Sequence, residues 1–508
     1  MNKNFFSLII ENLSNFNLPF IKTSGRRSYS YQDMIQLSGA YANALTKMGI
    51  RKGSRVMVQT EKKIECVWLY LACLRVGAIF VTINPSYTRS ETKFFLDDSD
   101  PALFVTDNNL RYREVLDFLD QDSHTKAIYL IRPKGPCLEK TASMSASNFR
   151  SSHCLGTDVA AILYTSGTTG RSKGAMITHE NLASNARALA EIWNFTSEDI
   201  LLHILPIYHT HGLFVAFNTV MVAGASIFFE DRFEMSRILK LVPNISVMMG
   251  VPTHYARLTR EKKFSADLTR KVRLFVSGSA PLSSDLHRKF EEQTRHTILE
   301  RYGMTETNMI TSNPYHGQRK PGTVGFPLPD VKIRVTSLET KKVVENETVG
   351  RVEVRGPNVF KGYWNLPEKT KMDFTADNYF ITGDLGFIDS DGHLNLSGRN
   401  KDLIISGGLN VYPAEIEQII DSLPEVSESA VIGLPHQDYG EGVTAAVTIE
   451  PGLEFNEYQI KKRLREKLAS FKIPIKILRL DSMPKNAMGK IEKVVLRDLF
   501  KNEYSTNS

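Results

Sequence analysis

A short segment in the first half of the chain combines residue types that suit the binding of phosphate. Residues 164–174 read YTSGTTGRSKG, and the apolar run AAIL at 160–163 leads directly into them. Glycine lets backbone N–H groups approach an anion closely, while serine and threonine hydroxyls and Lys173 add donors and positive charge. The segment does not fit the G-x-x-x-x-G-K-[ST] pattern of P-loop proteins. We therefore predict a phosphate-binding loop that follows a strand, with a flexible surface turn as the alternative.

The elements that must hold this loop alternate along the chain. Short β-branched or apolar runs recur with longer amphipathic stretches between them, which is typical of βαβ units and mainly parallel sheets. From about Pro321 closely spaced strands and turns predict a small antiparallel barrel or sheet, and after Arg399 mixed patterns predict a compact C-terminal domain. The runs that we interpret as parallel strands lie at 54–60, 78–83, 102–107, 160–166, 225–230, 246–252 and 273–282.

Length and composition indicate a globular protein with more than one domain. The chain has 508 residues, 42% of them hydrophobic, which is too long for a single core. Its longest apolar stretch, 67–83, is interrupted by Arg75 and Gly77, so we expect a buried helix that runs into a strand rather than a membrane span. No targeting signal is recognisable. The four cysteines form no CxxC pair, so we expect neither disulfides nor a zinc site, and a reducing cytoplasm fits best.

The positive charge of the chain is concentrated near its end. The formal net charge is +7, and residues 461–501 contain thirteen Lys and Arg against four Asp and Glu, which leaves +9 for that stretch. This basic stretch is interpreted either as a solvated helix face or as a surface that attracts a polyanionic ligand. We expect no nucleic-acid partner, because neither interleaved aromatic residues nor a binding motif accompanies the charge.

Five motifs follow one another in the order and approximate spacing of a known family. They are YTSGTTGRSKGAMITHENL (164–182), RYGMTET (301–307), YFITGDLG (379–386), LSGRNKDLIISGGLNVYPAEIE (396–417) and PKNAMGKIEK (484–493). Over nearly its whole length the chain resembles the adenylate-forming superfamily, which includes acyl-CoA synthetases, peptide-synthetase adenylation domains and beetle luciferases. Within that superfamily, ILPIYHTHGLF, VSGSAPL, LERYGMTETNM and RGPNVFKGYW look most like malonyl-CoA synthetases.

The resemblance implies an α/β fold with two domains. Residues 1–398 would form a large AMP-binding domain with two mainly parallel βαβ sheets and a small antiparallel, barrel-like part at about 321–398. Residues 399–508 would form a small mobile α+β domain. The two domains would be joined by a hinge at Lys401 in the family's GR-x-[KD] motif.

The resemblance also implies a reaction in two halves. A carboxylate attacks the α-phosphate of Mg-ATP to give an acyl-adenylate and pyrophosphate, and the thiol of coenzyme A then displaces AMP. Glu306, beside Thr305, would hold Mg²⁺, a hard ion that prefers oxygen ligands. The β- and γ-phosphates would be held by Thr165, Ser166, Gly167, Thr168, Thr169, Gly170 and Lys173.

Nucleoside and catalytic residues are implied by the later motifs. Tyr302 offers an aromatic face to adenine, and Asp384 can accept hydrogen bonds from both ribose hydroxyls, with Arg399 in reach of the same sugar. Lys490 would bridge the attacking carboxylate and the α-phosphate, where negative charge accumulates. Backbone edges for the base would come from Gly278, Ser279, Ala280 and Pro281 in the SGSAP turn.

The second half-reaction needs a different arrangement of the small domain. In the family this domain swings about the hinge, so that the hairpin ISGGLN (405–410) replaces Lys490 beside the adenylate. Gly408 would then line a pantetheine tunnel, because its missing side chain leaves room. The basic stretch at 461–501 could attract the nucleotide phosphates of coenzyme A.

Arg301 bears on the choice of acid. Synthetases for aryl and fatty acids commonly carry glycine at this position, immediately before the tyrosine. A guanidinium there would shorten the acyl pocket and pair with a second carboxylate, which favours malonate first and methylmalonate second; a structural salt bridge is the alternative. Arg288 is a weaker anion candidate, since its helical phase directs it towards solvent. Candidate pocket walls are His209, Thr210, His211 and Met304, although either histidine could equally be a core residue.

Three other functions stay open at this point. A carrier-protein adenylation enzyme would share the nucleotide motifs, but no carrier domain follows the terminal lysine motif. A short-chain monocarboxylate–CoA ligase would match apart from Arg301. A non-enzymatic nucleotide-binding or nucleic-acid-binding protein would have little reason to keep Lys173, Glu306, Asp384 and Lys490 together.

Replacement of Lys490 separates the two half-reactions. We expect Lys490→Ala to abolish adenylate formation but to leave the CoA-dependent turnover of a supplied acyl-adenylate largely intact, because the small domain carries Lys490 away before the thioester forms. ATP–pyrophosphate exchange and release of AMP from the supplied adenylate measure the two halves. Equal losses in both would contradict this division of labour.

Overall fold

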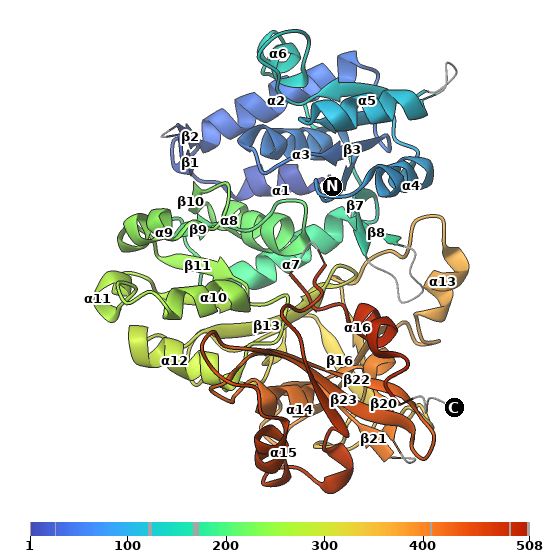
Figure 1. The fold of residues 1–508 in the computed structure, drawn as a ribbon. Coiled ribbons are helices and arrows are strands. Elements are labelled where there is room, and N and C mark those ends of the chain that lie inside the picture. Colours follow the sequence, from blue (N-terminus) through green and yellow to red (C-terminus); the bar gives the residue numbers. More distant parts are fainter. Residues whose placement is uncertain are drawn as a thin grey trace.

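Two sheets with helices between them form the large domain (Figure 1). The structure is a computed structural model, and it describes residues 2–25, 27–119, 124–165, 172–406, 409–486 and 489–504. The first sheet is parallel except for the antiparallel pair β7 and β8. Its strand order is β6 (Lys126–Tyr129), β5 (Leu103–Thr106), β3 (Arg55–Gln59), β4 (Ile79–Thr82), β7 (Val159–Thr165) and β8 (Lys173–Thr178).

The second sheet has nine strands and is parallel from β13 to β1. Antiparallel pairs extend it at both edges: β13 pairs with β14 and β14 with β15 at one edge, and β1 pairs with β2 at the other. Its strand order is β15 (Phe326–Pro327), β14 (Asn308–Ser312), β13 (Leu299–Met304), β12 (Leu274–Ser277), β11 (Val247–Gly250), β9 (Ile200–His203), β10 (Ser226–Phe229), β1 (Pro19–Thr23) and β2 (Ser28–Ser30). The prediction of two mainly parallel sheets is confirmed.

Both faces of these sheets are buried, because alternate side chains enter different cores. In β3, Val56 and Val58 pack with the central core while Met57 packs with Phe95 of α4 on the other face. The helices of the first sheet are α2 (Tyr31–Lys47), α3 (Ile64–Val76), α4 (Arg89–Ser99), α5 (Asn109–Phe118) and α6 (Leu138–Ser143). Those that pack with the second sheet are α1 (Phe5–Asn12), α7 (His179–Ile192), α8 (Asn218–Ala223), α9 (Met235–Leu241), α10 (Pro252–Thr259), α11 (Ala266–Thr269) and α12 (Ser284–Thr294), with the π-helix η1 (His211–Phe217) and the short 3₁₀ turn η2 (Val242–Asn244).

The apolar stretch at 67–83 folds as expected. Helix α3 is buried along its length and ends at Gly77, whose φ of 76° provides the left-handed cap, and strand β4 follows at once. No helix in the described ranges is long and apolar enough to cross a membrane.

The segment predicted as a small antiparallel barrel forms a four-stranded antiparallel sheet. Its order is β16 (Lys332–Thr336), β17 (Gly350–Arg355), β18 (Phe380–Ile388) and β19 (Leu394–Arg399), with α13 (Pro367–Met372) between β17 and β18. Four strands are too few to close around a packed interior. The register of β18 and β19 sets Asp384 directly opposite Arg399.

A separate small domain follows β19 and has its own cores. Helices α14 (Pro413–Ile420) and α15 (Glu457–Arg465) pack on one face of its sheet, and α16 (Lys493–Phe500) packs on the other. The sheet contains β21 (Leu409–Val411), β20 (Ile404–Ser406), β23 (Gly440–Ile449) and β22 (Val426–His436), and β24 (Lys476–Arg479) pairs with β23; the short turns are η3 (Asn400–Asp402) and η4 (Ser470–Lys472).

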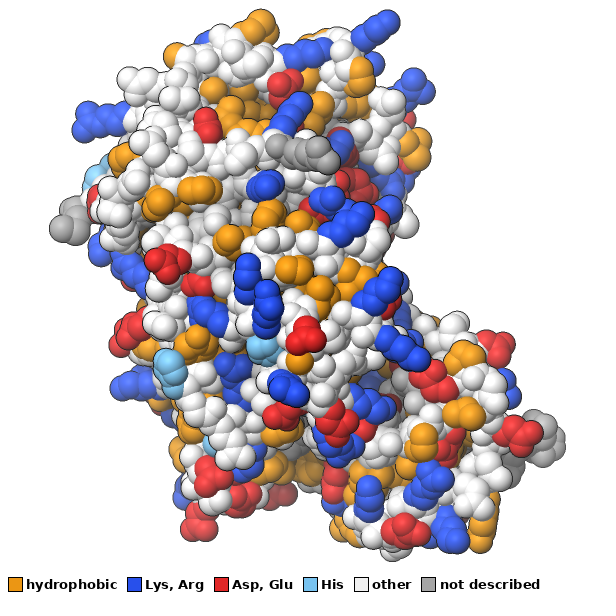
Figure 2. Space-filling view, turned by 90° about the vertical axis from the view of Figure 1, so that its left-hand side faces the viewer, with side chains coloured by type: hydrophobic (Ala, Val, Ile, Leu, Met, Phe, Trp, Pro, Cys, Tyr) orange, Lys and Arg blue, Asp and Glu red, His pale blue; other side chains and the backbone are white. Residues whose placement is uncertain are grey.

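The basic stretch at 461–501 is largely neutralised within the small domain. Seven of its thirteen cations form ion pairs with carboxylates that lie outside the stretch: Lys461, Arg463, Lys472, Lys476, Lys485, Lys493 and Arg497, with Glu457, Glu425, Glu415, Glu503, Glu428, Glu417 and Asp402 respectively. On the face shown in Figure 2, cationic and anionic side chains are interspersed. Carboxylates of the same domain therefore balance much of the charge of this stretch.

Lys401 is suited to a hinge because it is exposed in η3, between the two domains. Proline at this position fixes φ, so we expect Lys401→Pro to slow thioester formation much more than adenylate formation by hindering domain rotation. Lys401→Ala, which leaves φ free, is the matched control. Single-turnover rates for the two halves provide the measurement. If the proline variant runs both halves at the rate of the alanine variant, the hinge lies elsewhere.

Candidate active site

Thr165, Glu306 and Tyr363 meet at the start of the predicted phosphate loop. Thr165 is the last residue of β7, and Glu306 lies in the turn between β13 and β14. Glu306 Oε1 accepts hydrogen bonds from the Thr165 hydroxyl at 3.3 Å and from the Tyr363 hydroxyl at 3.0 Å. A buried carboxylate beside a hydroxyl is a hard oxygen donor set, which suits Mg²⁺ together with phosphate oxygens.

Lys173 stands at the other end of the same loop. The β7–β8 register pairs Lys173 with Thr165, so the two predicted phosphate ligands lie side by side. The Lys173 ammonium lies 3.9 Å from Asp373 Oδ2 and 4.3 Å from the centroid of the Tyr363 ring. Burial lowers the pKa of Lys173, and the charge of Asp373 opposes that effect. The predicted phosphate ligands between them, Ser166, Gly167, Thr168, Thr169 and Gly170, lie outside the described residues.

Tyr302, Asp384 and Arg399 form one connected group. Arg399 Nε lies 2.8 Å from Asp384 Oδ1, and the Tyr302 hydroxyl donates a hydrogen bond to Asp384 Oδ2. Burial raises the pKa of Asp384, while Arg399 and the hydrogen bond from Tyr302 oppose the rise. The structure thus brings together the three side chains predicted to recognise the nucleoside.

The SGSAP turn lies beside Arg301 and His211. Ser279 has a φ of 72°, a backbone region that costs a non-glycine residue roughly 1–3 kcal/mol and is found mostly at functional sites. A Cβ on Gly278 would lie 2.3 Å from Arg301 Cζ, so only glycine admits the guanidinium here. Ala280 and Pro281 are exposed. The turn therefore contributes to the predicted acyl pocket.

Arg301 is a buried cation that no described carboxylate neutralises. The residue is 4% exposed, and neither Nε nor Nη2 has a hydrogen-bond partner among the described residues. Burial lowers the pKa of Arg301 to about 9, which still leaves it charged at neutral pH. The structural salt bridge considered as an alternative is not found in the described part of the chain.

Two neutral histidines stand close to this guanidinium. Burial lowers the pKa of His209 to about 3, with the charges of Lys490 and Arg301 acting in the same direction, and His211 is shifted far below its usual range for the same reasons. His211 Nε2 and Thr210 Oγ1 are buried without a partner in the described residues. Met304, half-buried at the end of β13, completes the candidate wall.

Lys490 reaches this group from the small domain. The residue is exposed overall, but its ammonium lies within the field of Arg399, Asp384, Arg301 and Glu306. Burial lowers the pKa of Lys490, with Arg399 and Arg301 adding to the effect and Asp384 and Glu306 opposing it. The small domain is thus oriented so that its lysine faces the residues that would hold ATP and the acid.

Other predicted residues lie apart. Arg288 is exposed on α12 and pairs with Asp285 of the same helix at 2.6 Å, as its helical phase indicated. Gly408 lies outside the described residues, and Ile405 of the same hairpin is 53% exposed. Leu409, which follows Gly408, is 48% exposed as well.

Tyr363 is a site residue that the sequence interpretation missed. Its hydroxyl holds Glu306 and its ring lies under the Lys173 ammonium, so it orders two predicted phosphate-site residues at once. The contact with Glu306 spans 57 residues of sequence, and the GYW run that contains Tyr363 has the appearance of a core segment.

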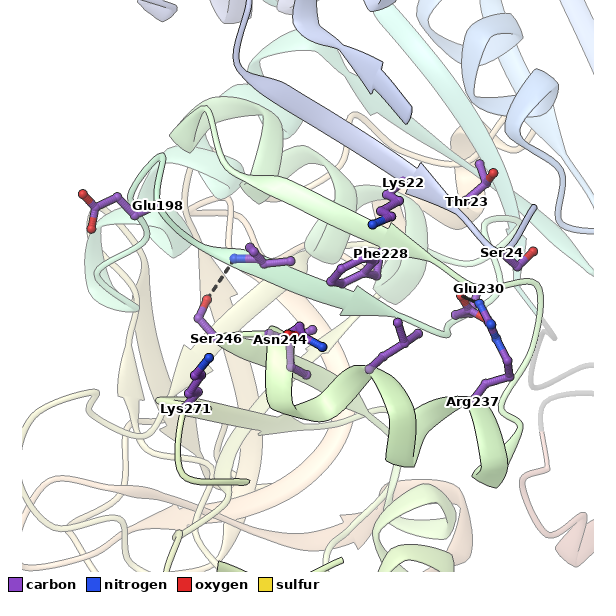
Figure 3. A pocket seen from close by; sticks show the side chains of 13 residues that line it. Lys22, Thr23, Ser24, Glu198, Phe228, Glu230, Arg237, Asn244, Ser246 and Lys271 are labelled. Carbon is purple, nitrogen blue, oxygen red and sulfur yellow. Dashed lines mark hydrogen bonds and ion pairs between the residues drawn. The ribbon is translucent and has the colours of Figure 1, made fainter. Parts of the chain in front are cut away.

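A cavity of about 1040 Å³ lies elsewhere, between the second sheet and α9 (Figure 3). Phe228 and Lys22 line it from the sheet, and Arg237 and Glu230 form an ion pair inside it at 2.7 Å. It contains none of the residues predicted to bind or act, so its size does not make it the catalytic site.

One group of potential metal ligands also lies outside the site. Asp389, Asp391 and His393 have ligand atoms within 4.8 Å of one another. The Lys320 ammonium lies 2.8 Å from Asp389 and 3.1 Å from Asp391, and it already balances their charge. This cluster is explained as a stabilised turn between β18 and β19.

Family models cover most of the chain. Residues 15–364 match the AMP-binding enzyme model, and residues 415–490 match the AMP-binding enzyme C-terminal domain. The chain is 36% identical to malonate–CoA ligase of Arabidopsis thaliana, over 90% of this chain and 79% of the relative. It is 38% identical to the mitochondrial malonate–CoA ligase of Bos taurus, over 96% of this chain and 88% of the relative.

Solved structures match the whole chain. ATP-bound MatB from Rhodopseudomonas palustris is 46% identical and superposes with a TM-score of 0.96 over 99% of this chain and 100% of that one. Apo MatB of the same organism, with the same identity and coverage, gives a TM-score of 0.86. Because the sequences compared are equally similar, the difference reflects arrangement, and the present chain is closer to the arrangement of the ATP-bound protein.

Removal of the Tyr363 hydroxyl tests its link to Glu306. We expect Tyr363→Phe to raise the Mg²⁺ concentration needed for half-maximal ATP–pyrophosphate exchange by about tenfold, since a hydrogen bond to a charged group is worth roughly 1.5 kcal/mol or more. Tyr363→Leu, which also removes the ring beneath Lys173, should in addition weaken ATP binding. An unchanged Mg²⁺ requirement in Tyr363→Phe would show that Tyr363 does not order the metal ligand.

Proposed function

The chain belongs to the AMP-binding enzyme family and is an AMP-forming acid–CoA ligase, and on this premise we propose that its acid is malonate, with methylmalonate as the second acid. The observation that carries the proposal is Arg301, a buried guanidinium with unpartnered N–H groups and no described carboxylate beside it. The relatives named malonate–CoA ligase and MatB support it. ATP, malonate and coenzyme A are its small-molecule partners.

Arg301 provides a buried guanidinium that can bind the second carboxylate of a short diacid. One carboxylate of malonate must attack ATP, so the other must enter the pocket as an anion. A guanidinium with free Nε and Nη2 presents two parallel donors to that distal carboxylate. Neutral His209 and His211 line the same pocket without adding charge. A monocarboxylate would leave Arg301 buried and unpaired, which argues against the short-chain monocarboxylate alternative.

The adenylation step follows from the groups that converge on the site. Lys490 would hold the attacking carboxylate oxygen against the α-phosphate and stabilise the charge that develops there. Asp384 and Arg399 would fix the ribose, and Tyr302 would cover adenine. Thr165 and Lys173 would hold the phosphates, and Glu306 with Thr165 would hold Mg²⁺, which neutralises phosphate charge when bound.

We assign the present arrangement to the first half-reaction, since Lys490 faces the site while Ile405 and Leu409 are exposed to solvent. For the second half, a rotation about Lys401 would exchange the two, with Gly408 at the pantetheine tunnel. We place the domain boundary between residues 398 and 399, which falls between the two matched family models.

We also propose that the enzyme works in the cytoplasm. All four cysteines, Cys66, Cys73, Cys137 and Cys154, are buried free thiols, a state that a reducing compartment maintains.

Replacement of Arg301 tests the proposed acid. We expect Arg301→Gly to lower kcat/KM for malonate roughly 30- to 5,000-fold, since truncation of one partner of a buried charge pair costs about 2–5 kcal/mol. For butyrate, which has no distal charge, kcat/KM should fall far less or should rise. The measurement is the malonate-to-butyrate ratio of kcat/KM.

Arg288→Ala is the matched control, because Arg288 is exposed and already paired. It should leave the ratio unchanged, and an unchanged KM for ATP in both variants would exclude misfolding. If Arg301→Gly keeps the wild-type ratio, Arg301 does not recognise the acid.

A further inference from the structure

A buried polar group joins the two sheets next to the acyl pocket. Lys62 follows β3 of the first sheet, His203 is the last residue of β9, and Glu230 follows β10 of the second sheet. Lys62 is 8% exposed and His203 is 1% exposed. None of the three was predicted as a site residue, and the KK pair at 62–63 resembles an ordinary surface run.

The Lys62 ammonium is fully hydrogen-bonded without any carboxylate contact. Its Nζ lies 2.8 Å from His203 Nδ1, 2.8 Å from His203 O and 2.6 Å from Glu230 O. Three acceptors match the three hydrogens of an ammonium, while burial lowers the pKa of Lys62 and the charges of Asp231 and Glu230 oppose that effect. The Phe229 ring, whose centroid lies 4.4 Å from Nζ, adds a cation–π contact.

These contacts fix the tautomer of His203. His203 Nε2 lies 2.9 Å from the carbonyl oxygen of Gly212, which can only accept, so the proton of the neutral imidazole lies on Nε2. His203 Nδ1 then accepts from Lys62. Burial and the neighbouring Lys62 charge hold the pKa of His203 far below its usual range, so the ring stays neutral.

Gly212 belongs to the element that forms the acyl wall. It is the second residue of η1, a π-helix, a rare element often found at functional sites. A Cβ at Gly212 would lie 2.0 Å from Pro206 O, so the backbone is tightly confined there. The preceding residue, His211, lies 3.2 Å from the Ser279 hydroxyl and within the field of Arg301. The position of Gly212 thus determines where this wall stands relative to Arg301.

We propose that Lys62 and His203 are positioning residues for the acyl pocket: Lys62 sets the His203 tautomer, and His203 holds η1 by the Gly212 carbonyl so that Thr210 and His211 face the acid bound by Arg301. Neither side chain touches the reacting atoms. The inference rests on the proposed function, because it concerns the same pocket, and it predicts an effect on the acid with little effect on ATP.

Two amide variants of His203 separate the two hydrogen bonds. His203→Gln extends an amide N–H to about the place of Nε2 and keeps the donor to Gly212. His203→Asn keeps an acceptor for Lys62 at about the place of Nδ1 but is too short to reach Gly212. We expect His203→Asn to raise KM for malonate about tenfold and KM for ATP less than about twofold, with His203→Gln within about threefold of wild type for both. Equal malonate KM values in the two variants would overturn the proposal.

The two neighbouring lysines provide a second matched pair. Lys62→Met should raise KM for malonate as His203→Asn does, whereas Lys63→Met should not, because the more exposed Lys63 ammonium pairs with Asp107 at 2.9 Å rather than with His203. Thermal unfolding midpoints identify variants that fail to fold. For those, histidine ¹⁵N spectra of the wild type provide the test: at least one ring must stay in the Nε2–H form from pH 6 to 8, and the absence of such a ring overturns the proposal.

The wild type assayed in parallel distinguishes the two proposals. If it releases no AMP with malonate, the proposed acid is wrong, and the variants are then compared with whichever acid supports CoA-dependent AMP release. If it uses malonate but the variants show no split between acid and ATP, only the positioning role fails.

Discussion

The acyl pocket depends on one cation, Arg301, that is charged and shielded from solvent. A buried guanidinium without a counterion is costly, so the surroundings must be shaped for it. Gly278 has no side chain, which leaves room for Arg301, and Ser279 next to it has a strained backbone conformation. His209 and His211 stay neutral, because burial lowers the pKa of both and the charge of Arg301 acts in the same direction. The acid that enters supplies the missing charge, so binding energy and selectivity come from the same contact.

The rest of the site follows from how the two sheets end. β3, β7, β9, β10 and β12 deliver Lys62, Thr165, His203, Glu230 and the SGSAP turn from their carboxyl ends, where ligands of parallel α/β sheets bind. The register of the strands then sets which side chains are neighbours: β7 and β8 pair Thr165 with Lys173, and β18 and β19 pair Asp384 with Arg399. Residues far apart in sequence therefore become neighbours through strand pairing alone.

The sequence allowed the parallel strands, the buried α3 and the nucleotide motifs to be predicted, because periodicity and short motifs are local signals. The isolation of Arg301 required the structure, since a missing partner has no sequence pattern. Tyr363 and His203 were not foreseen for a related reason, because each acts through a contact distant in sequence or through a backbone carbonyl. The net charge counted for the basic stretch overstated its free positive charge, because the carboxylates that pair with its cations lie elsewhere in the small domain.

The ion pairs of the small domain bear on its proposed rotation. Seven cations of the basic stretch are matched by carboxylates of the same domain, so these pairs would stay intact if the domain turned. By contrast, contacts that bridge to the large domain, such as Arg260 with Glu450 and Ser284 with Gln418, are exposed and weak. The electrostatic cost of a rotation would therefore arise at the site itself, where Lys490 lies in the field of Asp384 and Glu306.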